Sequence, residues 1–236
     1  MPGAGSEPPG RSRLIVAIDG PAGAGKSTVA RAVALRLGLR YLDTGAMYRA
    51  VTWAALTRSV PVDGPKLGRL VEAMQLAVST DPQAPSVQVD GIDVSTLIRG
   101  PAVTAAVSAV SALPAVRDRL RDRQRAIVGG GGIVVEGRDI GSVVLPEAPV
   151  KVFLTASAGA RARRRSVEQT DGRAPGDTGA VEATQAELAR RDAWDTARAA
   201  SPLTRAADAV ELDSTALSIE QVVAAVLALV PVEARL

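Results

Sequence analysis

The sequence contains no cysteine and no histidine. Without cysteine, the protein can form neither disulfide bonds nor thiolate metal sites. Without histidine, it lacks the side chain that most often serves as a general base or a zinc ligand. Any chemistry in this protein must therefore use aspartate, glutamate, arginine, lysine and hydroxyl groups.

Aromatic residues are also scarce, at 2% of the chain, although 47% of the residues are hydrophobic. The core must therefore consist mainly of alanine, valine, leucine and isoleucine. So few rings offer little for base stacking, and the net charge of +3 is a mixture of both signs. We expect no nucleic-acid partner. Since no apolar run approaches membrane-spanning length, we also expect a soluble, cytoplasmic protein that has no membrane partner.

The 236 residues are enough for one domain with a full core. Residues 1–12 are rich in glycine, proline and serine and lack an apolar segment, which predicts a disordered tail and no signal peptide. We expect residues 13–231 to form a single domain. The expected parts are a core (13–60, 101–160 and 180–231), an insert (61–100) and a lid (161–179).

A glycine-rich turn follows the first apolar segment of the chain. Residues 15–18 are apolar and partly β-branched, which predicts a buried strand, and a helical pattern begins at Thr28. Between them, Gly20–Ser27 fits G-x-x-x-x-G-K-S/T, the phosphate-binding P-loop. A plain strand-to-helix turn is the alternative, but the strand before the motif and the helix after it are the context that a P-loop requires.

The residue types of this motif suit a bound triphosphate. Glycines let backbone N–H groups face a phosphate, and the following helix N-terminus adds further donors. Lys26 can reach the terminal phosphates, and the Ser27 hydroxyl can coordinate Mg²⁺. We therefore expect ATP to bind on residues Gly20, Pro21, Ala22, Gly23, Ala24, Gly25, Lys26, Ser27 and Thr28.

Charged residues follow two further apolar segments, where strands of a parallel sheet would end. Residues 39–42 precede a helical pattern that carries Arg49 in its first turns, and residues 133–135 precede Arg138 and Asp139. Open α/β sheets bind ligands beyond the carboxyl ends of their strands. Arg138 and Asp139 are therefore candidate ligand contacts, whereas Arg49 could equally be an exposed helix arginine.

The rest of the chain alternates between strand and helix patterns, apart from residues 61–100. That segment contains four prolines and three short β-like runs, with a hairpin signal at Asp90-Gly91. Helices are predicted over 101–128, with a break near Pro114, and at the chain's end. The order predicts an α/β fold, a three-layer sandwich around a mostly parallel sheet with a small β-rich insert.

Three groups of arginines lie on predicted helices. We expect most of the group on 114–128, spaced at i, i+4 and i+8, to face solvent; its members are Arg117, Arg121 and Arg125. A second group precedes the Gly/Asp-rich stretch 169–179, as in a lid that closes over a transferring group; it comprises Arg161, Arg163, Arg164 and Arg165. The third group shares one face of a helix predicted at 182–199, as a surface salt-bridge ladder or a binding site would; it comprises Arg191, Asp195 and Arg198.

Several segments together have a more specific pattern than the P-loop alone. They are Ile18–Pro21, Leu42–Arg49, Glu136–Gly141, Arg191-Asp192 with Asp195 and Arg198, Ser201–Leu203, Leu212–Thr215 and Leu217-Ser218. In these segments the chain resembles the bacterial cytidylate kinases, the (d)CMP kinases of the nucleoside monophosphate kinase group of P-loop proteins. The resemblance covers about residues 14–230. The insert also fits, since the bacterial enzymes carry a small β-rich addition on the monophosphate side.

The resemblance implies ATP as the phosphoryl donor with Mg²⁺, and CMP or dCMP as the acceptor, in pyrimidine nucleotide metabolism. It implies a CMP site made by Thr44, Tyr48, Arg49, Ser108, Arg117, Arg138, Asp139, Arg191, Asp195 and Arg198. Of these, Ser108, Arg117 and Asp139 would read the cytosine, Arg49, Arg138 and Arg198 would hold the phosphate, and Arg191 with Asp195 would hold the sugar. Lys26, Arg138 and Arg198 would be the catalytic residues. We expect a monomer.

The predicted lid departs from the family pattern, because residues 169–179 are long and rich in glycine and aspartate. The individual roles of Arg161, Arg164 and Arg165 therefore stay open. A phosphate acceptor has a second pKa of about 6 and needs no general base near neutral pH, which suits a chain without histidine. Two alternatives remain: a P-loop kinase of another small acceptor, which for a hydroxyl compound would want a carboxylate base, and a non-catalytic nucleotide-binding switch.

Overall fold

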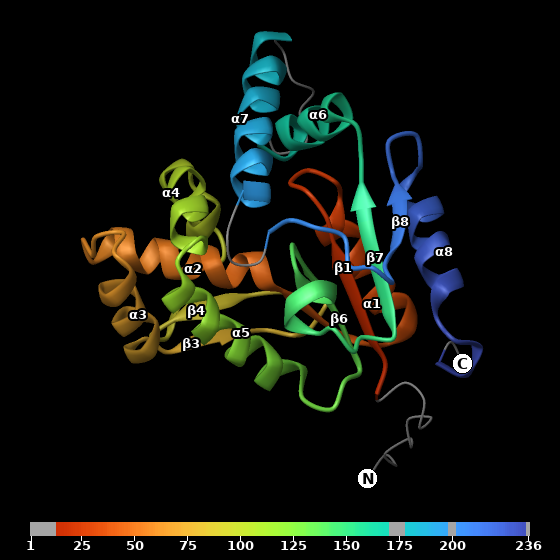
Figure 1. The fold of residues 1–236 in the computed structure, drawn as a ribbon, viewed down its shortest axis with the longest axis horizontal. Helices are drawn as coiled ribbons and strands as arrows, with labels where there is room; N and C mark the ends of the chain where they lie inside the picture. The colour runs from red at the N-terminus through yellow and green to blue at the C-terminus, as the bar shows by residue number, and fades with distance from the viewer. Residues whose placement is uncertain (1–12, 170–177, 198–201, 235–236) are drawn as a thin grey trace.

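A five-stranded parallel sheet forms the centre of the structure (Figure 1). The structure is a computed structural model and describes residues 13–169, 178–197 and 202–234. The strands are β1 (Ile15–Asp19), β2 (Arg40–Asp43), β6 (Ile133–Gly137), β7 (Val150–Thr155) and β8 (Val210–Asp213). Their spatial order is β2-β6-β1-β7-β8, and every pair is parallel. The predicted α/β fold with its parallel sheet is confirmed.

Helices cover both faces of this sheet, which makes it the middle of three layers (Figure 1). The covering helices are α1 (Lys26–Leu37), α2 (Thr44–Thr57), α5 (Pro114–Val128) and α8 (Ile219–Leu229), while α3 (Gly64–Ala73) and α4 (Pro101–Ser111) pack against α2 and α5. Val16 and Ile18 of β1 pack against α1 and α8, whereas Ala17 belongs to the core formed with α2, α3 and α5. This alternation is expected for a strand buried on both faces. The core is aliphatic, as the composition predicted.

The insert contains a separate antiparallel sheet of β3 (Leu76–Val78), β4 (Val87–Val89) and β5 (Ile92–Asp93). Asp90 and Gly91 connect β4 to β5 with φ values of 49° and 81°, which suits a two-residue hairpin turn. The predicted hairpin is therefore confirmed. The short turn η1 (Leu97–Arg99) leads from this sheet to α4.

Two helices, α6 (Ala158–Gln169) and α7 (Thr178–Ala197), pack on each other and project beyond the carboxyl ends of the strands (Figure 1). α7 begins four residues before the predicted start at residue 182, so Thr178 and Gly179 are helical and not part of a loop. Residues 170–177 of the predicted lid lie outside the described residues, as do 198–201 and the expected tail 1–12. No described helix has the length and apolar character that crossing a membrane requires.

The register of the parallel strands brings the three motif-bearing loops together. Asp19 at the end of β1 pairs with Gly137 of β6, and Asp43 at the end of β2 pairs with Glu136. After β6 the chain makes one turn of π-helix, η2 (Ile140–Val144), which the sequence pattern did not predict. The chain ends in the short turn η3 (Val232–Ala234).

The opposite end of the sheet is fixed by an arginine. Arg40 begins β2, and its guanidinium group donates to three carbonyl oxygens of the connection between α5 and β6. The acceptors are Ile127 at 2.8 Å, Val128 at 2.8 Å and Gly131 at 2.7 Å. Arg40 thereby satisfies carbonyl groups at the end of α5 that have no partner within the helix.

Candidate active site

The P-loop connects β1 to α1 and lies too close to its neighbours for side chains at two of its glycines. Gly20 has a φ of +147°, and a Cβ atom there would lie 2.0 Å from the Leu154 carbonyl oxygen of β7. Gly23 has a φ of +75°, and its Cβ atom would lie 2.9 Å from the Arg161 carbonyl oxygen of α6. Only glycine adopts such a conformation at low cost. The loop is therefore held between the sheet and α6.

Lys26 is the first residue of α1, and its ammonium group points back into the loop. It donates a hydrogen bond to the Pro21 carbonyl oxygen at 2.8 Å. Burial and the nearby Arg138 lower the pKa of Lys26 to about 8, while nearby carboxylates oppose this shift. A bound polyphosphate would favour the charged form of Lys26 in the same way as those carboxylates.

A buried carboxylate that the sequence pattern did not single out lies beside Ser27. Glu136 of β6 accepts a hydrogen bond from the hydroxyl of Tyr41 on β2, and the Ser27 side chain hydrogen-bonds to both groups. Burial and the neighbouring Asp43 raise the pKa of Glu136 to about 7. A cation at this point would offset the repulsion between the two carboxylates.

These groups fit a Mg²⁺ ion that arrives with a nucleotide better than a permanent metal site. Among the residues that the structure describes, no group of three or more acidic, cysteine or histidine side chains could hold a metal. Mg²⁺ takes oxygen ligands and usually combines one or two carboxylates with waters and substrate phosphates. The exposed Ser27 and the buried Glu136 offer a hydroxyl and a carboxylate for such a set.

Arginines from several elements lie close together opposite the P-loop. Burial, followed by the nearby Arg191 and Arg165, lowers the pKa of Arg49 on α2 to about 10. Burial, followed by Arg138 and Arg165, likewise lowers the pKa of Arg191 on α7 to about 10. The Nε atom of Arg191 is buried and has no hydrogen-bond partner among the described residues. A nearby anion would offset the repulsion between these guanidinium groups, which makes the cluster a candidate phosphate site.

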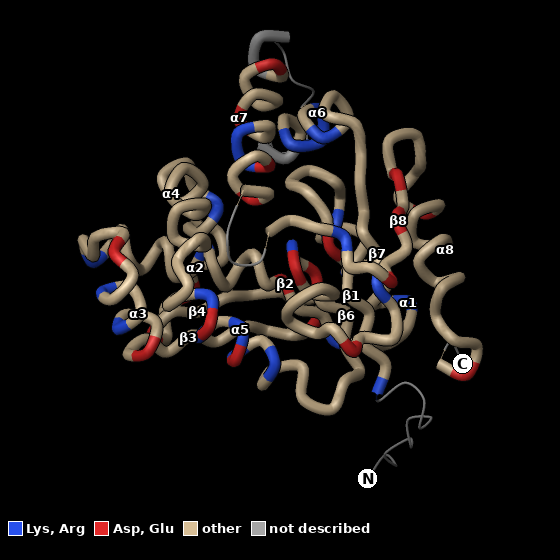
Figure 2. Tube along the Cα trace, viewed as in Figure 1, with Lys and Arg blue, Asp and Glu red and all other residues tan. Residues whose placement is uncertain are grey.

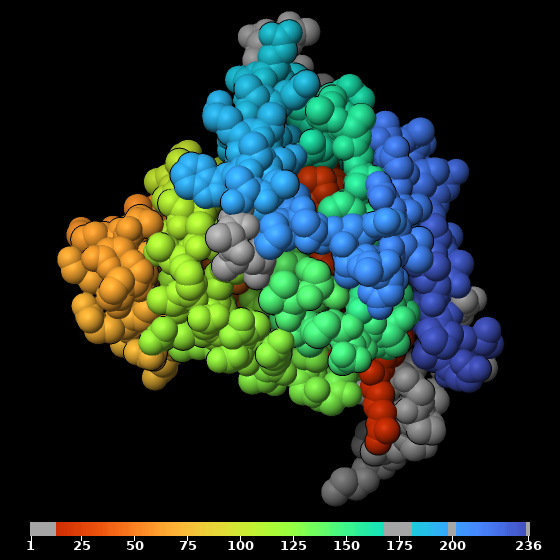
Figure 3. Space-filling model, in the orientation of Figure 1, coloured from red at the N-terminus to blue at the C-terminus, as the bar shows by residue number. Residues whose placement is uncertain are grey.

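The figures show how this cluster is enclosed. In Figure 2, basic positions lie along α6 and on the part of α7 nearest the sheet. Figure 3 shows an opening beneath α6 and α7, with part of the β1 and P-loop region (red) at its bottom. The P-loop and the arginine-bearing helices therefore face a shared hollow.

Asp195 faces into the site and does not form a surface salt-bridge ladder along α7. Its side chain is buried, and its Oδ2 atom lies 2.8 Å from Nη1 of Arg138, which follows β6. Asp192, one turn earlier, pairs with Arg161 of α6 and lies 3.7 Å from Arg138. These contacts join α7 to the end of β6 and to α6. Arg198, predicted as a catalytic and phosphate-binding residue, lies outside the described residues.

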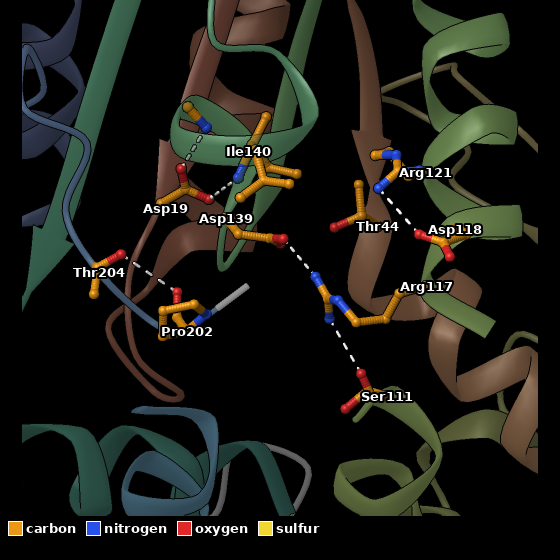
Figure 4. A network of polar contacts seen from close by, with 12 residues as sticks. Asp19, Thr44, Ser111, Arg117, Asp118, Arg121, Asp139, Ile140, Pro202 and Thr204 are labelled. Carbon is orange, nitrogen blue, oxygen red and sulfur yellow. Dashed lines mark hydrogen bonds and ion pairs between the residues drawn. The ribbon is translucent and has the colours of Figure 1, made fainter. Parts of the chain in front are cut away.

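Arg117 is buried and is an exception on the arginine face of α5, most of which was expected to face solvent. It forms an ion pair with Asp139, and the two side chains are only 8% and 7% exposed (Figure 4). Its other terminal nitrogen donates to the Ser111 carbonyl oxygen at 3.1 Å, and its guanidinium lies 5.5 Å from the ring centroid of Tyr48. Spacing along one helix could not reveal this, because Asp139 comes from another element. Arg125 of the same face is exposed, as expected.

Two further residues of the predicted CMP site, Thr44 and Ser108, form hydrogen bonds within the chain. The Thr44 hydroxyl donates to the Glu136 carbonyl oxygen at 2.7 Å and so fixes the start of α2 against the end of β6. Ser108 of α4 is half-buried, and its carbonyl oxygen accepts a hydrogen bond from the Ser111 hydroxyl at 3.1 Å. Ser108 is thereby connected to Arg117 through Ser111.

Two of the three predicted lid arginines contact the P-loop in this structure. Arg161 donates to the Ala22 carbonyl oxygen at 3.2 Å, and Arg164 donates to the Ala24 carbonyl oxygen at 3.2 Å. Arg164 also donates to the Ser214 hydroxyl, which follows β8, at 2.9 Å. Arg165, in contrast, belongs to the group of arginines near Arg49.

The sequence is similar to known proteins over most of its length. The family model described as cytidylate kinase matches residues 16–232. The chain is 52% identical to the cytidylate kinase of Streptomyces griseus over 223 residues, covering 93% of this chain and 94% of the relative. It is 52% identical to that of Mycobacterium avium (89% and 92% covered) and 48% identical to that of Geobacillus kaustophilus (93% and 97% covered). The chain belongs to the cytidylate kinase family.

Three side chains of this cytidylate kinase family member take part in the site without having been predicted. They are Asp19 and Glu136, near the carboxyl ends of β1 and β6, and Tyr41, the second residue of β2, whose hydroxyl reaches Glu136. Their positions after or within apolar strand segments were a usable signal, because polar residues at buried strand ends need a specific partner. Which partner each would find depends on the strand order, which the sequence pattern did not specify.

Proposed function

We propose that this protein transfers the γ-phosphate of ATP to CMP or dCMP, giving ADP and CDP or dCDP. Its membership of the cytidylate kinase family supports this activity. The observation that carries the proposal is the meeting of a P-loop with a cluster of half-buried arginines at the same end of the sheet. One side suits a triphosphate donor, and the other suits an acceptor that is itself an anion.

The reaction needs positioning and charge neutralisation more than proton transfer. An oxygen of the acceptor phosphate forms a bond to the γ-phosphorus while the bond to the bridging oxygen of ADP breaks. The acceptor has a second pKa of about 6 and is already nucleophilic near neutral pH. Two polyanions must approach in line, and Lys26 with Arg49 and Arg138 would offset their repulsion.

We assign base recognition to the buried pair of Arg117 and Asp139. Cytosine has an exocyclic amino group that donates hydrogen bonds, beside ring and carbonyl atoms that accept them. The Asp139 carboxylate suits the amino group and the Arg117 guanidinium suits the acceptors. The Tyr48 ring lies beside Arg117, and Thr44 is hydrogen-bonded to Glu136 near the end of β6, so we include both in the CMP site; we retain Ser108 on the resemblance.

We assign the sugar to Arg191 and Asp195, and retain Arg198 as a phosphate ligand on the resemblance alone. Asp195 is held beside Arg138, so the sugar and phosphate contacts adjoin each other. Arg161 and Arg164, which contact the P-loop, would bind the donor phosphates when α6 and α7 close over the site, whereas Arg165 lies near Arg49 on the acceptor side.

We propose that Mg²⁺ accompanies ATP and is held by the Ser27 hydroxyl and the Glu136 carboxylate, together with phosphate oxygens and water. When bound, the ion would neutralise charge on the donor phosphates. Tyr41 would orient the Glu136 carboxylate through its hydroxyl group. Ser27 would also remain within reach of Glu136, as it is in this structure.

A coupled assay of ADP release tests the proposal. The protein is supplied with ATP and Mg²⁺ and with CMP, dCMP, UMP, AMP or no acceptor. We expect kcat/KM for CMP or dCMP to exceed that for UMP by about 10- to 100-fold, the discrimination that one good pair of base contacts provides. Turnover that responds to a hydroxyl compound instead would favour another small-molecule kinase. Slow hydrolysis that no acceptor accelerates would favour a nucleotide-binding switch.

A further inference from the structure

Asp19, the last residue of β1, has a buried carboxylate with two backbone partners. Its Oδ1 atom accepts the N–H of Ile140 at 2.8 Å, and its Oδ2 atom accepts the N–H of Gly141 at 2.7 Å (Figure 4). The residue is 6% exposed. Burial raises the pKa of Asp19 to about 6, while the two N–H groups lower it. Burying a carboxylate costs free energy unless it is hydrogen-bonded. The two hydrogen bonds meet that need only while the turn at Ile140 and Gly141 keeps its position, so they hold the turn in place.

The two N–H groups follow directly after Asp139. The carbonyl oxygen of Asp139 in turn accepts the N–H groups of Val143 at 2.9 Å and Val144 at 3.1 Å. The backbone is therefore held on both sides of the residue that pairs with Arg117. This backbone fixes the direction in which the Asp139 side chain leaves the turn, and Figure 4 shows Asp19, Asp139 and Arg117 in one connected region.

The space around Gly141, whose N–H group donates to Asp19, is filled. A Cβ atom added to Gly141 would lie 3.1 Å from Cδ of Lys151 and 3.4 Å from Oδ2 of Asp19. Lys151 cannot move freely, because its ammonium group is bound to the Pro146 carbonyl oxygen and to Asp208 at 2.7 Å. The turn is therefore fitted between Asp19 and Lys151.

We propose that Asp19 is a positioning residue for base recognition: its two hydrogen bonds hold the turn from which Asp139 reaches the cytosine. This inference rests on the proposed function and extends it to a residue of the P-loop strand. Asp19 would act on the acceptor side although it directly precedes Gly20 of the donor loop. A role confined to folding would affect both substrates, and a role in the P-loop would affect ATP first.

The Asp19→Asn variant tests the proposal. Asparagine keeps the size but offers one acceptor oxygen, and its amide group would place N–H donors against the second backbone N–H. We expect kcat/KM for CMP to fall by about 10- to 100-fold, the effect of displacing a contact by about 1 Å. KM for ATP should stay within about twofold of the wild type. The preference for CMP over UMP should fall, because Asp139 is the group that detects the amino group.

Gly141→Ala provides a second perturbation of the same contact if the first variant does not fold. Its added methyl group would push the turn away from Asp19 and Lys151, so the same pattern is expected. Asp93→Asn is the control, since Asp93 likewise accepts a backbone N–H, that of Ser95 at 2.9 Å, but lies in the insert sheet. We expect its kinetic constants to match the wild type.

The kinetic constants of these variants distinguish a role of Asp19 in base recognition from a role in folding or in the P-loop. If Asp19→Asn keeps its CMP constants and selectivity, or if the KM values for ATP and CMP rise by the same factor, the inference is wrong. A double variant with Asp139→Ala adds a second criterion: Asp19→Asn should have little further effect on CMP there, because it acts through Asp139. A wild-type protein that does not phosphorylate CMP would refute the proposed function itself, and this inference with it.

Discussion

The pair of Arg117 and Asp139 can be tested through its effect on stability as well as on substrate choice. Asp139→Ala removes the carboxylate and leaves a buried guanidinium group without its ionic partner. Breaking a buried pair in this way costs about 3–5 kcal/mol. Arg117 keeps its hydrogen bond to Ser111 and its contact with the Tyr48 ring, so we expect the lower end, about 3 kcal/mol.

That loss can be expressed as a melting temperature. For a domain of this size, 1 kcal/mol corresponds to about 2–4 °C in Tm, so Tm should fall by about 6–12 °C. The matched control is Asp118→Ala on α5, where the carboxylate lies 3.1 Å from Arg121 but its side chain is 59% exposed. Such an exposed pair contributes about 0–1 kcal/mol, so the control should melt within about 4 °C of the wild type.

The assay is thermal unfolding with and without ligand. In the wild type, CMP at about 100 times its Kd should stabilise the protein by about 2.7 kcal/mol. Asp139→Ala should lose most of that CMP-dependent increase in Tm and keep the increase caused by a non-hydrolysable ATP analogue. A variant that melts with the wild type, or that retains the full response to CMP, would refute the assignment of Asp139 to the base.

Three further predictions concern other parts of the site and the fold. Lys26→Ala should lower turnover by about 10³-fold or more in the coupled assay while CMP still raises Tm, because the lysine lies on the donor side; substantial remaining turnover would contradict its role. Arg49→Ala should raise KM for CMP by about 10- to 100-fold, with KM for ATP unchanged, since charged hydrogen bonds contribute about 1.5–3 kcal/mol. Equal changes in the two KM values would show that Arg49 does not act on the acceptor alone. Arg40→Ala should lower the free energy of unfolding, measured in urea, by about 2–4 kcal/mol without changing either KM, because three carbonyl oxygens lose their donor. An unchanged urea midpoint would show that water replaces the guanidinium group.

Features that depend on neighbouring residues in the sequence could be predicted well. The P-loop and the hairpin at Asp90-Gly91 have local signatures, because both need glycine conformations at fixed positions. The strand segments could be recognised from their apolar residues, and their carboxyl ends pointed to Arg138 and Asp139 as candidates. These two side chains do lie at the end of β6, although their roles with CMP stay a prediction.

Features that depend on which strands become neighbours could not be predicted in the same way. The i, i+4, i+8 spacing of the α5 arginines says which side chains share a face, but of these three only Arg117 meets Asp139, which follows β6. Glu136 and Tyr41 are brought together because β2 pairs with β6 and not with β1. Sequence periodicity carries no information about that order. Asp19 meets Ile140 for the same reason.

The contact between Asp19 and Ile140 joins positions 121 residues apart in the chain. Between their strands in the sequence lie β2, the insert sheet and the helices from α1 to α5. Closing so long a loop is entropically costly and makes folding slow compared with that of proteins dominated by local contacts. The two substrate sites would therefore form together, late in folding, when β6 enters the sheet between β1 and β2. A growing chain that has emerged only through α5 would carry a complete P-loop sequence but no acceptor site, and so no kinase activity.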